Sequence, residues 1–224
     1  MICVSVYEPT ADACLESLKG LTFAEVRIDA MAHAGADDIR KIFRLPVTLV
    51  ATFRPQGPNH AKELIPGDGV RKELLMAAIE AGASYVDIEL GSDRAYRAGL
   101  IAKARSMNCE VIVSAHIFDG TPGTDDLIAI ASRCFDEGAD IAKIACMVSS
   151  EGDNIRLLGL LIRPGLTGRT VVIGMGEKGK VTRIAAPLLG SPFTYASISD
   201  EKRTADGQMD MLTMELILKA LKDG

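Results

Sequence analysis

Short β-rich runs alternate with helical stretches along the whole chain, and this alternation limits the fold more than any other feature. The 224 residues hold eight candidate strands, so one strand–helix unit recurs about every 28 residues. The predicted strands cover residues 2–7, 23–29, 47–53, 84–90, 109–116, 139–145, 170–175 and 193–197. This repeat predicts an α/β protein, a (β/α)8 TIM barrel formed as a single domain over residues 1–224. An open, doubly wound sheet has the same alternation and is the alternative.

Two of the helical stretches have clear boundaries. Residues 69–82 and 124–138 carry apolar side chains at helical spacing, and each ends in a glycine. We expect Asp68 and Thr124 to cap the starts of these helices, with Gly82 and Gly138 closing their ends.

Charged side chains recur inside the predicted strands. Residues two apart in a strand share a face, and in a barrel one face of every strand points inward. The charged residues that this places together are Glu25, Arg27, Asp29, Arg54, Asp87 and Glu89. We expect the two arginines to be neutralised by the four carboxylates, since a buried charge needs a partner. The open sheet offers these residues no common place, which favours the barrel. A purely structural ion network is the alternative to a functional one.

Lys143 stands in the apolar run ADIAKIA, residues 139–145. Lysine is rarely buried, and burial can lower the pKa of its amine by several units from about 10.4. A neutral amine is a nucleophile that condenses with a ketone to form a Schiff base. His116, one strand earlier, is a candidate general acid and base. A salt-bridged structural lysine and a core histidine are the alternatives.

The segment GMGEKGK (174–180) fits two phosphate-binding patterns, GxGxxG and GxxxxGK. Val181 stands where the second pattern needs Ser or Thr, and too few residues follow for a dinucleotide fold. We therefore interpret the segment as a tight turn, with Met175 lining a site.

Composition excludes several classes of function. The net charge of −5 argues against nucleic acid as a partner, and no apolar stretch is long enough to span a membrane. The five cysteines have no CxxC spacing and the three histidines no HxH pattern, so we expect no metal site. The start lacks the pattern of a signal peptide, and we expect a cytoplasmic protein.

An ordered set of motifs resembles the type I 3-dehydroquinate dehydratase family. The motifs are EVRID (25–29), TFR (52–54), VSAHIF (113–118), AKIACM (142–147), GMGEKGKVTR (174–183) and TADGQ (204–208). The resemblance covers nearly the whole chain. It implies a barrel, commonly a homodimer, that dehydrates 3-dehydroquinate to 3-dehydroshikimate without a cofactor. This reaction belongs to the shikimate pathway of aromatic amino-acid biosynthesis.

The resemblance also implies roles for individual residues. Lys143 matches the imine-forming lysine, and His116 matches the histidine that takes the C2 proton and assists loss of the C1 hydroxyl. Arg183 matches the arginine that holds the substrate carboxylate. The other matched substrate-binding positions are Glu25, Arg27, Arg54, Thr204, Gln208, Met175 and Tyr195. Thr204 replaces a serine of the family pattern, and Tyr195 replaces a phenylalanine.

One position departs from the family pattern. Many members carry a glutamate four residues after the arginine of TFR, where it pairs with the catalytic histidine. Here Pro58 occupies that position. Either Glu63 takes its place, or His116 works without that partner.

Two other functions are compatible with the residues. A class I aldolase is also a Schiff-base barrel, but enzymes acting on phosphorylated sugars need a phosphate cradle near strands 7 and 8. A non-catalytic barrel that binds a small acid would keep Lys143 as a salt-bridged structural charge.

Overall fold

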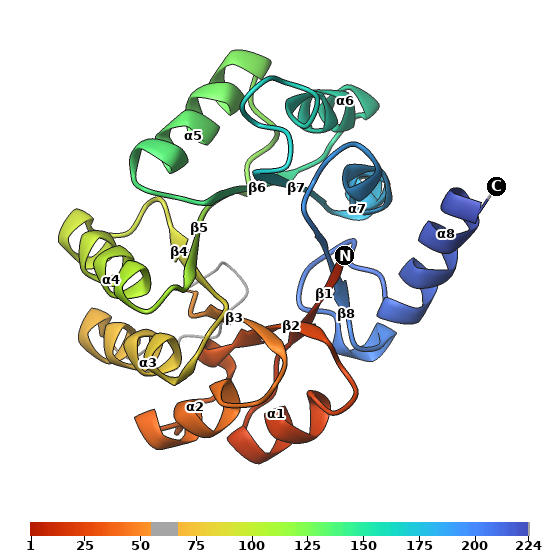
Figure 1. Cartoon of the computed structure of the whole chain (residues 1–224). Helices are drawn as coiled ribbons and strands as arrows, with labels where there is room; N and C mark the ends of the chain where they lie inside the picture. The colour runs from red at the N-terminus through yellow and green to blue at the C-terminus, as the bar shows by residue number, and fades with distance from the viewer. Residues whose placement is uncertain (55–66, 224) are drawn as a thin grey trace. The chain divides into compact units, whose positions relative to one another are not determined.

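Eight strands alternate with eight α-helices along the chain (Figure 1) in a computed structural model that describes residues 1–54 and 67–223. The strands form one parallel sheet in the order β7-β6-β5-β4-β3-β2-β1-β8. The predicted (β/α)8 barrel is confirmed, and the open sheet is excluded.

The strands are β1 (Ile2–Val6), β2 (Phe23–Arg27), β3 (Thr48–Thr52), β4 (Tyr85–Glu89), β5 (Glu110–Ile117), β6 (Ile141–Met147), β7 (Thr170–Met175) and β8 (Thr194–Ser197). The α-helices are α1 (Ala11–Ser17), α2 (Ala36–Phe43), α3 (Asp68–Ala81), α4 (Arg94–Ser106), α5 (Thr124–Asp136), α6 (Glu151–Leu160), α7 (Lys180–Ala185) and α8 (Met211–Asp223). Short 3₁₀ helices cover Ile28–Ala30, Glu177–Gly179, Ala186–Leu188 and Asp200–Lys202.

The contacts within the chain divide it into two compact units. One unit comprises Met1–Ser5 and Val113–Gly224, and the other comprises Val6–Ile112. The first unit, called unit 1 below, holds β6, β7 and β8 with the helices that follow them. The second, unit 2, holds β2, β3 and β4. Each unit is described by itself.

Strand β6 of unit 1 begins and ends later than the sequence predicts. The prediction placed this strand at 139–145, but it runs from Ile141 to Met147 because its register with β7 pairs Ala142 with Thr170 and Met147 with Met175. Both strands are almost wholly buried, as expected for parallel strands covered on two faces. Lys143 therefore stands in the first half of the strand and not near its end.

The helix ends confirm two of the predicted caps and correct two others. Gly82 and Gly138 both have positive φ, 111° and 99°, at the ends of α3 and α5. Asp68 and Thr124 are not N-caps, because each of them is the first residue of its helix. Gly67 and Gly123 precede these helices, with no side-chain cap.

None of the helices in the described part of the chain is both long and apolar enough to cross a membrane.

Three backbone amides of the glycine-rich segment 174–180 donate hydrogen bonds within the protein. The Gly174 N–H donates to Thr182 Oγ1 (2.7 Å), and Gly179 N–H donates to the Gly176 carbonyl (3.1 Å). Gly176, with φ of 81°, donates its N–H to the carbonyl of Asp206 (3.2 Å). An amide that is already bonded is not free to hold a phosphate, which supports the interpretation of this segment as a tight turn.

We predict that Gly179→Ala lowers the free energy of unfolding by about 1–3 kcal/mol, because an added Cβ would overlap the backbone of Gly174. Gly159→Ala in α6 is the matched control, since a Cβ there meets nothing within 4 Å and alanine favours a helix. Urea denaturation measures both variants. Equal stability of the two would contradict this account of the turn.

Candidate active site

The amine of Lys143 is buried in unit 1. The residue is 4% exposed, and its Nζ lies 4.1 Å from the centroid of the Tyr195 ring on β8. Its neighbours Ala142 and Ile144 are fully buried. An ammonium over an aromatic face gains a cation–π attraction, which is stronger away from water. The predicted burial of this lysine is confirmed.

Arg183 on α7 is among the largest buried side chains, at 2% exposure. Its Nη1 donates a long hydrogen bond of 3.5 Å to the Tyr195 carbonyl, and its Nε has no partner among the described residues. Burial lowers the pKa of Arg183 to about 10. Buried guanidinium groups are normally paired, and the planar fork of arginine suits a carboxylate. Among the described residues, the guanidinium of Arg183 therefore has no carboxylate partner.

Tyr195 contacts both of these cations. Its ring faces Lys143, its carbonyl accepts from Arg183, and Phe193 packs on it edge to face with ring centroids 5.5 Å apart. The resemblance matches Tyr195 to a substrate-binding position. In the structure its ring contacts the Lys143 amine and its carbonyl accepts from Arg183.

Thr204 and Gln208 lie on the segment between β8 and α8 and bond to each other. Gln208 is buried, and its Oε1 accepts from the N–H of Thr204 (2.7 Å) and from Oγ1 of Thr204 (3.0 Å). The bond between Gly176 and Asp206 joins this segment to the end of β7. The two predicted binding residues are thus brought together on a segment with defined geometry.

Met175 and His116 lie on the strands flanking β6. Met175 is the last residue of β7, is buried and pairs in register with Met147. His116 is on β5, half-buried, and its ring stacks with that of Phe118 at a centroid distance of 6.3 Å. Strand β5 is the neighbour of β6 in the sheet, so the predicted acid–base group and the predicted nucleophile are carried by adjacent strands.

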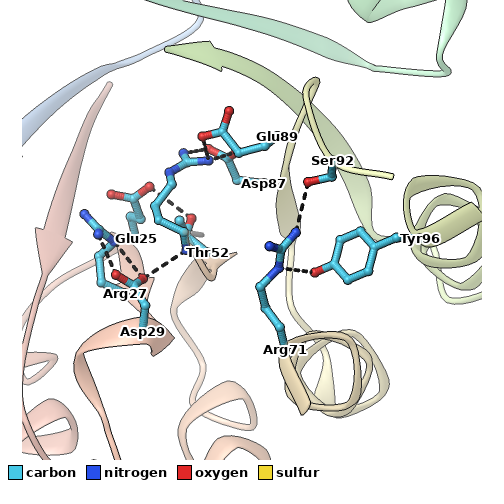
Figure 2. A network of polar contacts seen from close by, with 10 residues as sticks. Glu25, Arg27, Asp29, Thr52, Arg71, Asp87, Glu89, Ser92 and Tyr96 are labelled. Carbon is cyan, nitrogen blue, oxygen red and sulfur yellow. Dashed lines mark hydrogen bonds and ion pairs between the residues drawn. The ribbon is translucent and has the colours of Figure 1, made fainter. Parts of the chain in front are cut away.

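In unit 2, Arg54 lies against two carboxylates of β4. Its Nη1 donates to Asp87 Oδ1 and Glu89 Oε1, both at 2.8 Å, and its Nη2 donates to Asp87 Oδ2 at 2.5 Å. Burial opposes the charge of Arg54, but the two carboxylates together raise its pKa. The predicted neutralisation of this arginine is confirmed. Figure 2 shows the side chains of Asp87 and Glu89 close together.

Arg27 is neutralised by Asp29, with Nε–Oδ1 at 2.9 Å and Nη2–Oδ2 at 2.6 Å (Figure 2). Asp29 was predicted to lie in β2, and this prediction is wrong. Strand β2 ends at Arg27, and a 3₁₀ turn follows it. That turn brings the carboxylate back onto the arginine. Glu25, buried on β2, accepts from Thr52 Oγ1 at 3.0 Å.

Arg71 is a buried arginine that we did not predict from the sequence. Arg71 on α3 donates to Tyr96 Oη on α4 (2.7 Å) and to Ser92 Oγ (2.9 Å), and so joins α3 to α4 (Figure 2). Neither partner is a strand residue, so we assign Arg71 to the packing of unit 2. Pro58 and Glu63, the residues on which the pairing of His116 depends, lie outside the described residues.

The chain was compared with known proteins. A family model described as type I 3-dehydroquinase matches residues 2–224. A 3-dehydroquinate dehydratase of Methanothermobacter thermautotrophicus is 39% identical over 216 residues, covering 94% of this chain and 92% of the relative. The protein of that name from Methanococcus maripaludis is 33% identical over 225 residues, covering 99% and 100%. A crystal structure of 3-dehydroquinate dehydratase from Geobacillus kaustophilus superposes with a TM-score of 0.85 at 24% identity, covering 99% of this chain and 91% of the other.

We predict that Arg183→Met leaves the free energy of unfolding at pH 7 unchanged or raises it by up to about 3 kcal/mol, because the variant removes a buried, uncompensated charge. The pKa of Arg183 is lowered on folding, so the cost of its charge to the fold is full at pH values below about 10 and declines progressively as the pH rises further. The difference between variant and wild type should therefore shrink as the pH rises through 10.

Arg54→Met is the matched control for urea denaturation. It leaves Asp87 and Glu89 without their guanidinium, so we expect a loss of about 3–5 kcal/mol. If Arg183→Met costs as much as Arg54→Met, then Arg183 is compensated within the protein.

Proposed function

Since the chain belongs to the type I 3-dehydroquinase family, we propose that it removes water from 3-dehydroquinate through an imine formed by Lys143, with His116 as general acid and base. The chain is a hydro-lyase, a 3-dehydroquinate dehydratase of the shikimate pathway. The observation that carries the proposed mechanism is the burial of the Lys143 amine inside an apolar strand.

In the first step, Nζ of Lys143 attacks the C3 ketone of the substrate. A carbon–nitrogen bond forms, and the ketone oxygen leaves as water with one proton from the amine and one from solvent. The resulting protonated imine draws electrons from C2 and makes the C2–H bond acidic. The face of the Tyr195 ring, 4.1 Å from Nζ, supports this step because it stabilises a positive charge at the nitrogen.

In the second step, His116 takes the C2 proton as the C2–H electrons move into the imine. It then donates a proton to the C1 hydroxyl, which leaves as water while the C1–C2 double bond forms. Hydrolysis of the imine restores Lys143 and releases 3-dehydroshikimate. The position of His116 on the strand next to β6 supports this role.

We assign the substrate carboxylate to Arg183, whose guanidinium is buried without a carboxylate partner among the described residues. The remaining contacts on this side are assigned to Thr204, Gln208, Met175 and Tyr195. The ring hydroxyls are assigned to Glu25, Arg27 and Arg54. The two arginines are held by their carboxylate partners, and Glu25 is held by the hydroxyl of Thr52. In this proposal residues 1–224 act as one catalytic domain without a cofactor or metal.

The alternatives lose their support. Family membership argues against a non-catalytic barrel. A phosphate-binding aldolase would need free amides near β7, yet those of Gly174, Gly176 and Gly179 already donate within the protein.

We predict that borohydride, added during turnover of 3-dehydroquinate, inactivates the enzyme and leaves a reduced adduct on Lys143. Peptide mass mapping locates the adduct. Lys143→Ala should take up no label and lose at least about 1,000-fold in kcat, since the covalent route is gone. Lys103→Ala on α4, which removes a surface amine paired with Glu80, is the control and should be labelled like the wild type. Full turnover by Lys143→Ala would exclude the imine.

We also propose that two copies of the chain pair through α8. This helix is apolar on two opposite faces: Met214 and Leu218 are buried, whereas Leu212 and Leu216 are largely exposed. A surface helix normally has a polar outer face, so an outer leucine stripe suggests a covering partner. Glu215 and Lys219 beside Leu216 are both exposed and offer charges of opposite sign to a second copy.

We predict that Leu216→Glu converts the dimer to a monomer without unfolding it, because a carboxylate would be buried at the contact and Leu216 is 71% exposed in the single chain. Sedimentation velocity measures the mass, which is 23.9 kDa for one chain. Val70→Glu on α3, an exposed apolar residue of unit 2, is the control and should stay dimeric. A monomeric wild type at micromolar concentration would refute the pairing.

A further inference from the structure

Ser197, the last residue of β8, carries a buried hydroxyl without a hydrogen-bond partner among the described residues. The residue is 0% exposed, and only its backbone is engaged, with the N–H donating to the Met209 carbonyl at 2.9 Å. A hydroxyl offers one donor and two acceptors, and leaving it unused away from water costs free energy. Nothing in the packing of β8 requires an oxygen at this position.

Ser197 lies near the residue of β8 that contacts Lys143 and Arg183. It stands two residues after Tyr195, so both side chains leave the same face of β8. Tyr195 is the residue that contacts both Lys143 and Arg183. Two residues of strand advance the chain by about 6–7 Å toward its carboxyl end, which is the end where barrel enzymes bind their substrates.

We propose that Oγ of Ser197 donates a hydrogen bond to the substrate carboxylate that Arg183 binds, and that Ser197 is therefore a further substrate-binding residue. This inference rests on the function proposed above. A carboxylate has about four acceptor sites, of which the fork of an arginine uses two. A neutral O–H donor near that arginine can use a third. The hydroxyl is then unsatisfied only until substrate arrives.

Thr170 provides a matched comparison. Its Oγ1 is also buried without a partner among the described residues, but Thr170 is the first residue of β7, at the opposite end of its strand. The amino-terminal ends of barrel strands contribute to stability and not to catalysis. Thr170→Val therefore removes the same kind of group from a place where no substrate binds.

The test is steady-state kinetics on Ser197→Ala and Thr170→Val with 3-dehydroquinate. We expect Ser197→Ala to raise KM roughly 10-fold with kcat changed less than about threefold, because a hydrogen bond to a charged group is lost in binding and not in the chemical step. Thr170→Val should match the wild type in both constants. An unchanged KM in Ser197→Ala, or equal shifts in both variants, would overturn the assignment.

A second measurement tests the shared carboxylate. If Ser197 and Arg183 hold the same group, Ser197→Ala should raise KM less in an Arg183→Met background than in the wild type. Full additivity would place the serine elsewhere. Ser197→Cys, with a weak S–H donor of similar volume, provides the same kinetic test if the alanine variant does not fold.

The imine mechanism and the role of Ser197 can be refuted separately. A wild-type enzyme that takes up no borohydride label on Lys143 would refute the imine mechanism. A labelled wild type combined with an unchanged KM in Ser197→Ala would refute only the role of the serine.

Discussion

The guanidinium of Arg54 lies between two carboxylates, whereas that of Arg183 meets no carboxylate in the described part of the chain. Both groups are removed from water, and a buried charge must be compensated by something. In unit 2 the protein supplies the compensation itself. In unit 1 the described residues offer Arg183 no carboxylate, and our proposal assigns that task to the substrate.

The same contrast separates fixed parts of the proposed site from responsive ones. The arginines of unit 2 are held by Asp29, Asp87 and Glu89 before any ligand arrives, which is the condition for electrostatic stabilisation without reorganisation. Arg183 and Ser197 instead each have a buried hydrogen-bonding atom without a partner among the described residues, which lowers the stability of the fold. A site built in this way discriminates against ligands without a carboxylate, because such ligands leave the guanidinium uncompensated.

The sequence was sufficient to predict the elements whose residue types allow one structure. The run TVVIGM predicted β7 with the correct bounds, and the alternation of Glu25 and Arg27 in β2 predicted a charged face. The sequence was insufficient where the pairing of strands in the folded chain determines the end of an element. The run ADIAKIACM has no Gly or Pro to end a strand, so only its register with β7 determines that the strand ends at Met147. Asp29 was misplaced because no local signal ends β2 at Arg27.

The candidate site shows the same division. The burial of Lys143 followed from its neighbours, but the relation between this amine and Arg183 depends on a third residue far along the chain. Ser197 was missed altogether, although the alternation from Tyr195 places it on the same face of β8. What could have identified it, the absence of a hydrogen-bond partner, is a property of the folded chain and is not visible in a sequence.

Tyr195 is in contact with Lys143 through its ring and with Arg183 through its carbonyl. A change at this position alters the surroundings of the proposed nucleophile and of the proposed carboxylate-binding group in the same mutational step. We therefore expect the effect of a replacement at Tyr195 to depend on the residues at positions 143 and 183. The family pattern has phenylalanine at the position, and exchange between the two rings keeps the π face and the backbone carbonyl, whereas an aliphatic residue would need compensating changes at both partners. We expect evolutionary drift at these three positions to be correlated, with the aromatic ring as the most restricted member.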